Sequence, residues 1–420
     1  MKDGVSLSLH IPEPAWRPGD PVDFRGMTLP PAGSAPRPDI ACPAEATQEL
    51  ASGLIRVLDD EGRAVGPWAP ELEPALLIRG LRSMMLVRAF DDRMHRQQRQ
   101  GKTSFYLKCA GEEAVGVAQA LALGPDDMCF PTYRQQGVLI TRGYPLAEMM
   151  NQIYSNACDP MKGRQLPVLY SSRAFGFFTI SGNLGTQFSQ AVGWAMASAY
   201  KGDTRIAFTY IGDGSTAEGD FHQALLFASV YRAPVLLNIV NNQWAISAFH
   251  GIAGDEKATF ASRGLGYGLP SLRVDGNDFL AVYAATRWAA ERARANLGAT
   301  LIEHFTYRAS AHSTSDDPTR YRPAEEWESW PLGDPIERLK RHLVAEGLWS
   351  DERHAAAEAE VDEQVRQAGR EAERIGAFGA SRPPVEEMFH DVYREQPWHL
   401  RQQAQELLAE LETPTKAQGD

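Results

Sequence analysis

Between residues 128 and 308, short apolar runs alternate with helical segments, and this alternation constrains the fold more than any other feature of the chain. The strand-like runs are MCFPTY, RIAFTYIG, APVLLNIVNN and ATLIEHFTYR, and the segments between them include the helical patterns AVGWAMASAY, FHQALLFASVYR and FLAVYAATRWAAERARAN. Strands that are apolar throughout and separated by helices are typical of a parallel sheet covered on both faces. The sequence therefore predicts an α/β fold with a doubly wound parallel sheet over residues 71–330.

Segments of different character flank this domain. Residues 1–70 contain too many prolines for helix interiors or central strands, so we expect an extended arm. A disordered tail is the alternative, although apolar residues such as Trp16, Phe24 and Leu54 favour an arm that lies on a partner or on the chain's own body. Within it, GLIRVLDDEGRAV predicts a small hairpin. Residues 331–420 are charged and helical in pattern, which predicts a helical C-terminal appendage and no second sheet domain.

Charge and composition narrow the class of protein. The chain has 42 Lys and Arg residues against 54 Asp and Glu residues, a net charge of −12, so nucleic acid is not an expected partner. No stretch approaches the 18 or so apolar residues of a membrane span, and the first residues lack the apolar core of a signal peptide. The four cysteines are widely spaced, which argues against a disulfide framework or structural zinc. We expect a cytoplasmic protein.

Two loops that follow strand-like runs carry candidate ligands. RIAFTYIG leads into Gly212, Asp213, Gly214 and Ser215, where the glycines would let the backbone approach a ligand and Asp213 would offer a carboxylate to Mg²⁺ beside phosphate groups. The next strand ends at Asn241 and Asn242. Sequential right-handed crossovers can place the two loops side by side, so that Asn242 supplies a second oxygen to the same ion. Taken alone, Gly-Asp-Gly is also a common turn.

Two other nucleotide motifs do not fit these residues. A dinucleotide fingerprint needs glycine where the chain has Ala217, and a P-loop needs lysine where Gly219 is followed by Asp220.

The paired GDG and NN motifs resemble the thiamine diphosphate and Mg²⁺ motif of thiamine-dependent enzymes. The surrounding segments resemble the alpha subunits of branched-chain 2-oxoacid dehydrogenases, and they are SFYLKCAGEEA, FPTYRQQGVLI, KGRQLPVLYSS, TISGNLGTQ, GDGSTAEGDFHQALLFASV, NNQWAIS, SLRVDGND and TYRASAHSTSDDPTRYR. They span about residues 75–330. HSTSDD and KGRQLPV favour the branched-chain enzymes over their pyruvate and acetoin relatives.

The resemblance implies a cofactor site. Mg²⁺ would be bound by Asp213, Asn242 and the backbone carbonyl of Trp244. The residues implied for binding thiamine diphosphate are Tyr133, Arg134, Gly182, Leu184, Gly212, Asp213, Gly214, Ser215, Asn242, Trp244 and His312. Gly182 and Val240 stand where the family carries Ser and, in some members, Arg, so one diphosphate contact differs in this chain.

Further residues are implied for the substrate and for a monovalent cation. Phe105, Tyr133 and Leu184 would line a pocket for an apolar substrate tail, although a core role for Phe105 stays open. A K⁺ site is implied at Ser181, Asn183, Thr186 and Gln187, and a polar loop capping the following helix is the simpler alternative.

His312 opens the polar loop HSTSDD after the last strand-like run. A lone loop histidine is more often solvated than catalytic. The resemblance implies that His312 anchors the diphosphate and acts in acyl transfer, and that Arg308, Ser313, Asp316, Asp317, Tyr321 and Arg322 order the loop.

The resemblance finally implies a heteromeric enzyme. A beta subunit in an α2β2 heterotetramer would complete each site, and a lipoyl-bearing acyltransferase core would accept the acyl group from branched-chain 2-oxoacids. A pyruvate or acetoin dehydrogenase subunit, or a non-catalytic nucleotide-binding subunit, is the alternative.

Overall fold

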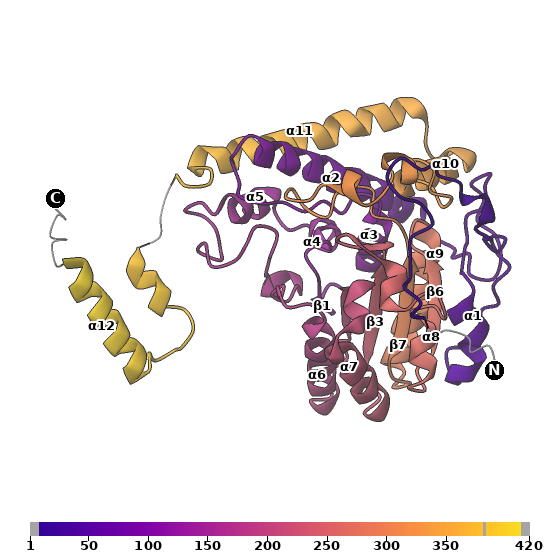
Figure 1. Ribbon diagram of the computed structural model, residues 1–420, viewed down its shortest axis with the longest axis horizontal. Helices are drawn as coiled ribbons and strands as arrows, with labels where there is room; N and C mark the ends of the chain where they lie inside the picture. Colours follow the sequence, from indigo (N-terminus) through magenta and orange to yellow (C-terminus); the bar gives the residue numbers. More distant parts are fainter. Residues whose placement is uncertain (1–7, 381–383, 413–420) are drawn as a thin grey trace, which may run out of the picture.

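The computed structural model describes residues 8–380 and 384–412, so residues 1–7 of the expected arm and 381–383 and 413–420 of the expected tail lie outside the described residues. Its centre is a parallel sheet of five strands (Figure 1). In spatial order these are β1 (Met128–Phe130), β2 (Ala207–Gly212), β3 (Val235–Asn241), β7 (Thr300–Phe305) and β6 (Ser271–Asp275). A short antiparallel pair, β4 (Trp244–Ala245) and β5 (Ala248–Phe249), follows β3.

Helices make up most of the remaining regular structure. The α-helices are α1 (Gln48–Ser52), α2 (Pro74–Arg99), α3 (Glu113–Ala122), α4 (Gln136–Thr141), α5 (Leu146–Tyr154), α6 (Thr186–Tyr200), α7 (Gly219–Val230), α8 (Ser262–Leu265), α9 (Phe279–Arg294), α10 (Pro335–Ala345), α11 (Asp351–Ile375) and α12 (Trp398–Glu412). The 3-10 helices are η1 (Phe24–Gly26), η2 (Ala44–Thr47), η3 (Arg173–Phe175), η4 (Gly214–Ala217), η5 (His250–Ala253), η6 (Pro318–Arg320), η7 (Ala324–Glu326) and η8 (Val385–Phe389). Among the described residues, no helix has the length and apolarity needed to cross a membrane.

Side chains alternate between the two faces of the sheet, as a strand's period of two requires. In β2, Phe208 and Tyr210 belong to the core formed with α2, α3 and α9, whereas Ala207 and Ile211 belong to the core formed with α6 and α7. Both faces are therefore covered by helices. This arrangement confirms the predicted doubly wound α/β fold.

The N-terminal arm lies on the chain's own body. Leu58 pairs with Ala64 in the predicted hairpin, and Ile55 bridges to Val274 at the edge of the sheet. The indole N–H of Trp288 donates to the carbonyl of Pro38 at 2.9 Å. An extended proline-rich segment cannot form a ladder of its own, so such contacts hold it in place.

The helices after residue 331 extend the core. Figure 1 shows α11 lying along α2, and Val361, Val365 and Ala372 are buried in the same core as α2 and α3. Glu373 of α11 accepts hydrogen bonds from Arg93 at 2.9 Å and from Lys102 at 2.7 Å. By contrast, α12 lies apart from the α/β body in Figure 1.

Candidate functional site

The carboxyl ends of four neighbouring strands converge on one cavity of about 450 Å³. Gly212 of β2 pairs with Val240 of β3, so the next residues, Asp213 and the Asn241–Asn242 pair, emerge side by side at the sheet edge. The eleven residues implied for cofactor binding all line this cavity: Tyr133, Arg134, Gly182, Leu184, Gly212, Asp213, Gly214, Ser215, Asn242, Trp244 and His312. The order of the strands thus gathers residues that are far apart in the sequence.

Asp213 has one carboxylate oxygen without a partner. Its Oδ1 accepts a hydrogen bond from the backbone N–H of Gly214 at 2.8 Å, but Oδ2 is buried and makes no hydrogen bond. Burial raises the pKa of Asp213 to about 6. A buried carboxylate oxygen without a donor is unfavourable unless a cation or another donor compensates it. Asp213 therefore fits a divalent cation.

Asn242 is fixed by hydrogen bonds at both ends of its amide. Its Nδ2 donates to Oε1 of Glu112 at 2.6 Å, and its Oδ1 lies 3.4 Å from the backbone N–H of Trp244. The carbonyl of Trp244 accepts from Nη1 of Arg308 at 3.0 Å. Because a carbonyl oxygen has two lone pairs, a metal ion at Trp244 would share this oxygen with Arg308.

Two guanidinium groups give one wall of the site a positive charge. Arg134 is almost fully buried, lines the cavity, and donates to the carbonyls of Lys108 and His312. Its carboxylate neighbour, Glu112, lies 4.0 Å away. Arg308 is completely buried behind the lining residues and bonds to carbonyls and to the Tyr321 hydroxyl. Such a wall favours an anion such as a diphosphate.

His312 is neutral in this environment. Its Nδ1 lies 3.1 Å from Nη2 of Arg134 and 3.3 Å from Nη1 of Arg308, both of which can only donate. Nδ1 is therefore the acceptor, and the ring proton is on Nε2. Burial, with the charges of Arg134 and Arg308, lowers the pKa of His312 to about 3.

The loop of His312 is held by the residues expected to order it. The backbone N–H of His312 donates to Asp316 at 2.7 Å, and the hydroxyl of Tyr321 donates to the same carboxylate oxygen at 2.6 Å. Arg322 donates to the carbonyl of Arg308 at 2.8 Å. Ser313 accepts local hydrogen bonds from the N–H groups of Ser315 and Asp316, and Asp317 caps η6.

Three of the four residues implied for a monovalent cation meet at one carbonyl. The carbonyl of Asn183 accepts from the hydroxyls of Ser181 at 3.2 Å and Thr186 at 2.9 Å. Gln187, in the first turn of α6, is buried and its Oε1 has no hydrogen-bond partner. The loop thus gathers several oxygens, the ligand type that K⁺ takes.

The substrate residues are divided between two places. Tyr133 and Leu184 line the cavity, and Leu184 is 45% exposed. Phe105 is half-buried, packs against the main core and is not among the residues that line the cavity. Its role toward the substrate stays a prediction.

Gly214 has a steric role that the sequence did not indicate. A Cβ atom at Gly214 would lie 2.4 Å from the Cβ of Ala245, so glycine here lets the loop after β2 approach the loop after β3. At Gly212, by contrast, a Cβ would meet nothing within 4 Å, which leaves the backbone open to the cavity. Glycine at 214 therefore lets the two loops meet, and because both glycines line the cavity, the expected approach of their backbone to a ligand stays a prediction.

Two groups near the site were missed by sequence reasoning. Glu112 lines the cavity, and burial raises its pKa to about 7. His250 lines the same cavity and bonds to Asp255 at 2.6 Å. Glu112 precedes a helix, where an acidic residue is ordinary, so its sequence context gave no separate signal.

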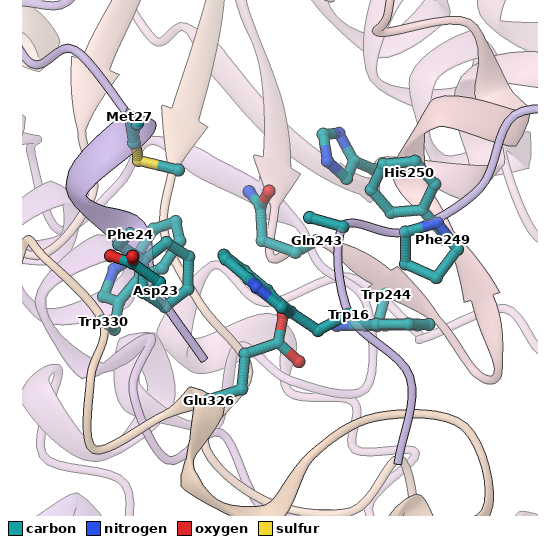
Figure 2. Close-up of a pocket in the computed structure, with 13 residues that line it drawn as sticks. Trp16, Asp23, Phe24, Met27, Gln243, Trp244, Phe249, His250, Glu326 and Trp330 are labelled. Atoms are coloured by element: carbon teal, nitrogen blue, oxygen red, sulfur yellow. The ribbon is translucent and has the colours of Figure 1, made fainter. Parts of the chain in front are cut away.

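A second cavity of about 320 Å³ lies on the arm side of the loop after β3. Figure 2 shows Trp16, Phe24 and Met27 of the arm around the same space as Trp244 and Phe249. Trp244 and Phe249 line both cavities. The arm therefore supports the loop that carries Asn242 and Trp244.

Comparison with known proteins agrees with this geometry. The family model described as dehydrogenase E1 component matches residues 81–380, and the model described as 2-oxoisovalerate dehydrogenase E1 alpha subunit N terminal matches residues 5–45. The 2-oxoisovalerate dehydrogenase subunit alpha of Pseudomonas aeruginosa is 60% identical over 97% of this chain and 100% of its own length. The mitochondrial human subunit alpha is 40% identical over 86% of this chain and 80% of its own length, and a mitochondrial subunit alpha of Arabidopsis thaliana is 41% identical over 83% and 73%. The chain belongs to the dehydrogenase E1 component family, among the alpha subunits of 2-oxoisovalerate dehydrogenases.

Proposed function

We propose that this chain is the diphosphate-binding alpha subunit of a thiamine diphosphate-dependent enzyme that decarboxylates branched-chain 2-oxoacids and transfers the acyl group to a lipoyl arm. The observation that carries the proposal is the meeting of Asp213, Asn242 and Arg134 in one cavity, with the free Oδ2 of Asp213 buried there. Carboxylate and amide oxygens suit Mg²⁺, and a buried guanidinium suits a diphosphate.

The residues present fit the cofactor. Asp213, Asn242 and the carbonyl of Trp244 would hold Mg²⁺, and Arg134, with Tyr133, Ser215 and the open backbone at Gly212, would bind the diphosphate. When bound, thiamine diphosphate supplies the thiazolium carbon that attacks the 2-oxo carbon and the ring that accepts the electron pair released with CO₂.

Two arginines of the chain orient the imidazole of His312. Arg134 and Arg308 keep Nδ1 of His312 an acceptor, so Nε2–H is the donor available to a ligand in the cavity. This donor is suited to anchoring the diphosphate and to stabilising, by a hydrogen bond, the negative charge that develops on a lipoyl sulfur during acyl transfer. Tyr133 and Leu184 would contact the apolar substrate tail.

A beta subunit and an acyltransferase core are the proposed partners. Activation of the cofactor needs a carboxylate at its aminopyrimidine, and we assign it to a beta subunit in an α2β2 heterotetramer. The relatives from Pseudomonas aeruginosa and human are alpha subunits by name, which supports a partner of this kind. If so, the chain expressed alone binds no competent cofactor and gives no appreciable decarboxylation, whereas the co-expressed pair does.

We further propose a K⁺ site and a cytoplasmic location. K⁺ would be bound by the oxygens of Ser181, Asn183, Thr186 and Gln187, and it would brace the loop that carries Leu184.

The four cysteines are free in the structure, which supports a reducing compartment such as the cytoplasm.

Calorimetry of the assembled enzyme tests the cofactor. Thiamine diphosphate at 100 times its Kd should stabilise the native state by about 2.7 kcal/mol, and only when Mg²⁺ is present. Asp213→Asn and Asn242→Ala should remove most of this stabilisation. Equal stabilisation by ATP or NAD would instead favour a non-catalytic nucleotide-binding subunit.

Competing substrates test the substrate class. Each buried methylene contributes about 0.8 kcal/mol, roughly fourfold in kcat/KM. We therefore expect 3-methyl-2-oxobutanoate to exceed pyruvate by about tenfold or more. Equal values, or a preference for pyruvate, would assign the chain to a pyruvate or acetoin enzyme.

A further inference from the structure

Glu112 and Asn242 form a buried contact at the base of the cofactor cavity. Oε1 of Glu112 accepts from Nδ2 of Asn242 at 2.6 Å, and both side chains line the cavity. Glu112 is 4% exposed and Asn242 is 7% exposed. The other oxygen of Glu112, Oε2, is buried and makes no hydrogen bond. Solvent therefore does not compete for this contact.

The backbones of both residues are anchored to the segment that follows β7. The carbonyl of Gly111, directly before Glu112, accepts from Thr306 at 3.0 Å and from Asn277 at 3.2 Å. The carbonyl of Asn242 accepts from the N–H of Arg308 at 3.2 Å. Gly111 also has a φ of +92°, and a Cβ there would lie 2.3 Å from the carbonyl oxygen of Tyr307. The distance between Glu112 and Asn242 is thus set by a rigid support.

The contact decides which way the Asn242 amide faces. Oε1 of Glu112 accepts from Nδ2, so the NH₂ group faces Glu112, and the amide oxygen, 3.4 Å from the N–H of Trp244, keeps a lone pair for another partner. An amide that turned over would present NH₂ to a metal ion and lose its bond to Glu112. Groups that orient metal ligands in this way usually contribute ten- to hundredfold to metal affinity.

We propose that Glu112 is a positioning residue, which holds the amide of Asn242 so that its oxygen faces Mg²⁺. This inference rests on the proposed function, since it requires that Asn242 bind the ion. Glu112 acts through Asn242 and does not itself bind the metal. The rival explanation is that the negative charge of Glu112 merely attracts the cation.

Two substitutions distinguish the hydrogen bond between Glu112 and Asn242 from the negative charge of Glu112. Glu112→Gln removes the charge but keeps an oxygen that can accept from Asn242, whereas Glu112→Asp keeps the charge but withdraws it by one methylene from a 2.6 Å contact. We expect the Kd for Mn²⁺, measured by electron paramagnetic resonance in the presence of thiamine diphosphate, to rise a few-fold in Glu112→Gln and about ten- to hundredfold in Glu112→Asp. The assembled enzyme is used throughout, with unchanged circular dichroism as the check on folding. Asp127→Asn, at a buried carboxylate directly before β1 and so at the opposite end of that strand from the cavity, serves as the control and should leave the Kd unchanged.

A double substitution tests whether Glu112 affects Mn²⁺ binding through Asn242. In an Asn242→Ala background, Glu112→Asp should cause no further loss of Mn²⁺ affinity, because the amide it orients is absent. An additive loss, or a larger loss in Glu112→Gln than in Glu112→Asp, would overturn the inference in favour of charge. If wild-type enzyme binds Mn²⁺ and Glu112→Asp binds it equally well, the inference about Glu112 is wrong and the proposed function is unaffected. If wild-type enzyme binds no Mn²⁺ in the presence of thiamine diphosphate, both the proposed function and the inference about Glu112 are wrong.

Discussion

Arg134 contacts His312 twice through one nitrogen: Nη2 donates to the backbone carbonyl at 2.7 Å and lies 3.1 Å from the ring Nδ1. These contacts place both the loop and the imidazole. Since a guanidinium never accepts, they also set the tautomer of the ring. Arg134, which is suited to binding a diphosphate, therefore also keeps the ring proton of His312 on Nε2.

His312→Ala should separate acyl transfer from cofactor binding. We expect lipoyl-dependent activity to fall by roughly 10²- to 10³-fold, the usual contribution of a preorganised hydrogen-bond donor that faces developing negative charge. Decarboxylation with an artificial electron acceptor, which bypasses the lipoyl step, should fall much less. Parallel assays of the assembled enzyme measure both. Equal losses that excess thiamine diphosphate restores would assign His312 to anchoring alone.

The neutral state of His312 can be observed directly. Because burial and two guanidinium groups lower its pKa to about 3, the imidazole of the cofactor-free protein should stay neutral down to pH 5. In ¹⁵N spectra of histidine-labelled protein, the signal lost in His312→Ala should keep the shifts of an Nε2–H tautomer between pH 8 and 5. A midpoint near 6.5 for His312 would contradict the geometry.

Affinity for Mg²⁺ should depend on the protonation of Asp213. Burial raises the pKa of this carboxyl to about 6, and only the ionised form binds the ion. The Kd for Mg²⁺ should therefore rise about tenfold per pH unit below about pH 6 and level off above it. Titrations with thiamine diphosphate present measure this, with Mg²⁺ binding to the free cofactor subtracted at each pH. A Kd that is constant from pH 5 to 7 would show that burial does not affect Asp213 in this way.

We expect Gly214→Ala to weaken Mg²⁺ binding through a steric clash that a second substitution removes. The new methyl group would lie 2.4 Å from the Cβ of Ala245, so the loops after β2 and β3 must separate and Mg²⁺ binding should weaken. Adding Ala245→Gly deletes the opposing carbon and should restore most of the affinity. Gly219→Ala, whose Cβ meets nothing within 4 Å, is the matched control. If Ala245→Gly gives no rescue, the clash is not the cause.

Asp278 should control attachment of the arm. Its carboxylate accepts from the N–H groups of Val57 at 2.8 Å and Leu58 at 2.6 Å, and it also caps α9. Asp278→Ala leaves these buried donors without partners, which should cost at least about 2 kcal/mol of unfolding free energy. Limited proteolysis should then cut within residues 8–70 before the α/β body. Asp20→Ala, on the exposed part of the arm, should leave the cleavage pattern unchanged.

The sequence predicted those parts of the fold that depend on regular patterns. The strands β2 and β3 are buried and mostly apolar, and the glycine and asparagine at their ends mark where each strand stops. Neighbouring strands in a parallel sheet then bring Asp213 and Asn242 together. The strand β6 was missed, because it has five residues and Arg273 interrupts its apolar character.

Features that depend on contacts between distant segments could not be predicted in the same way. The bond between Glu112 and Asn242 joins residues 130 positions apart, and the steric requirement at Gly214 exists only because Ala245 packs against it. Nothing in the local sequence of either residue indicates its partner. Local pattern predicts elements and their ends, whereas side-chain orientation within the site depends on tertiary packing.

Attachment of the arm has a consequence for the order in which the chain folds during synthesis. Val57 bonds to Asp278, a residue 221 positions later, and Trp288, which binds Pro38, follows it. At a ribosomal rate of about 5 to 20 residues per second, roughly ten to forty seconds pass between translation of the arm and translation of its docking site. During that interval the arm can form its own hairpin, but the residues on which it docks have not yet been made. Its prolines, which disfavour helices and central strands, keep it from forming competing structure while it waits.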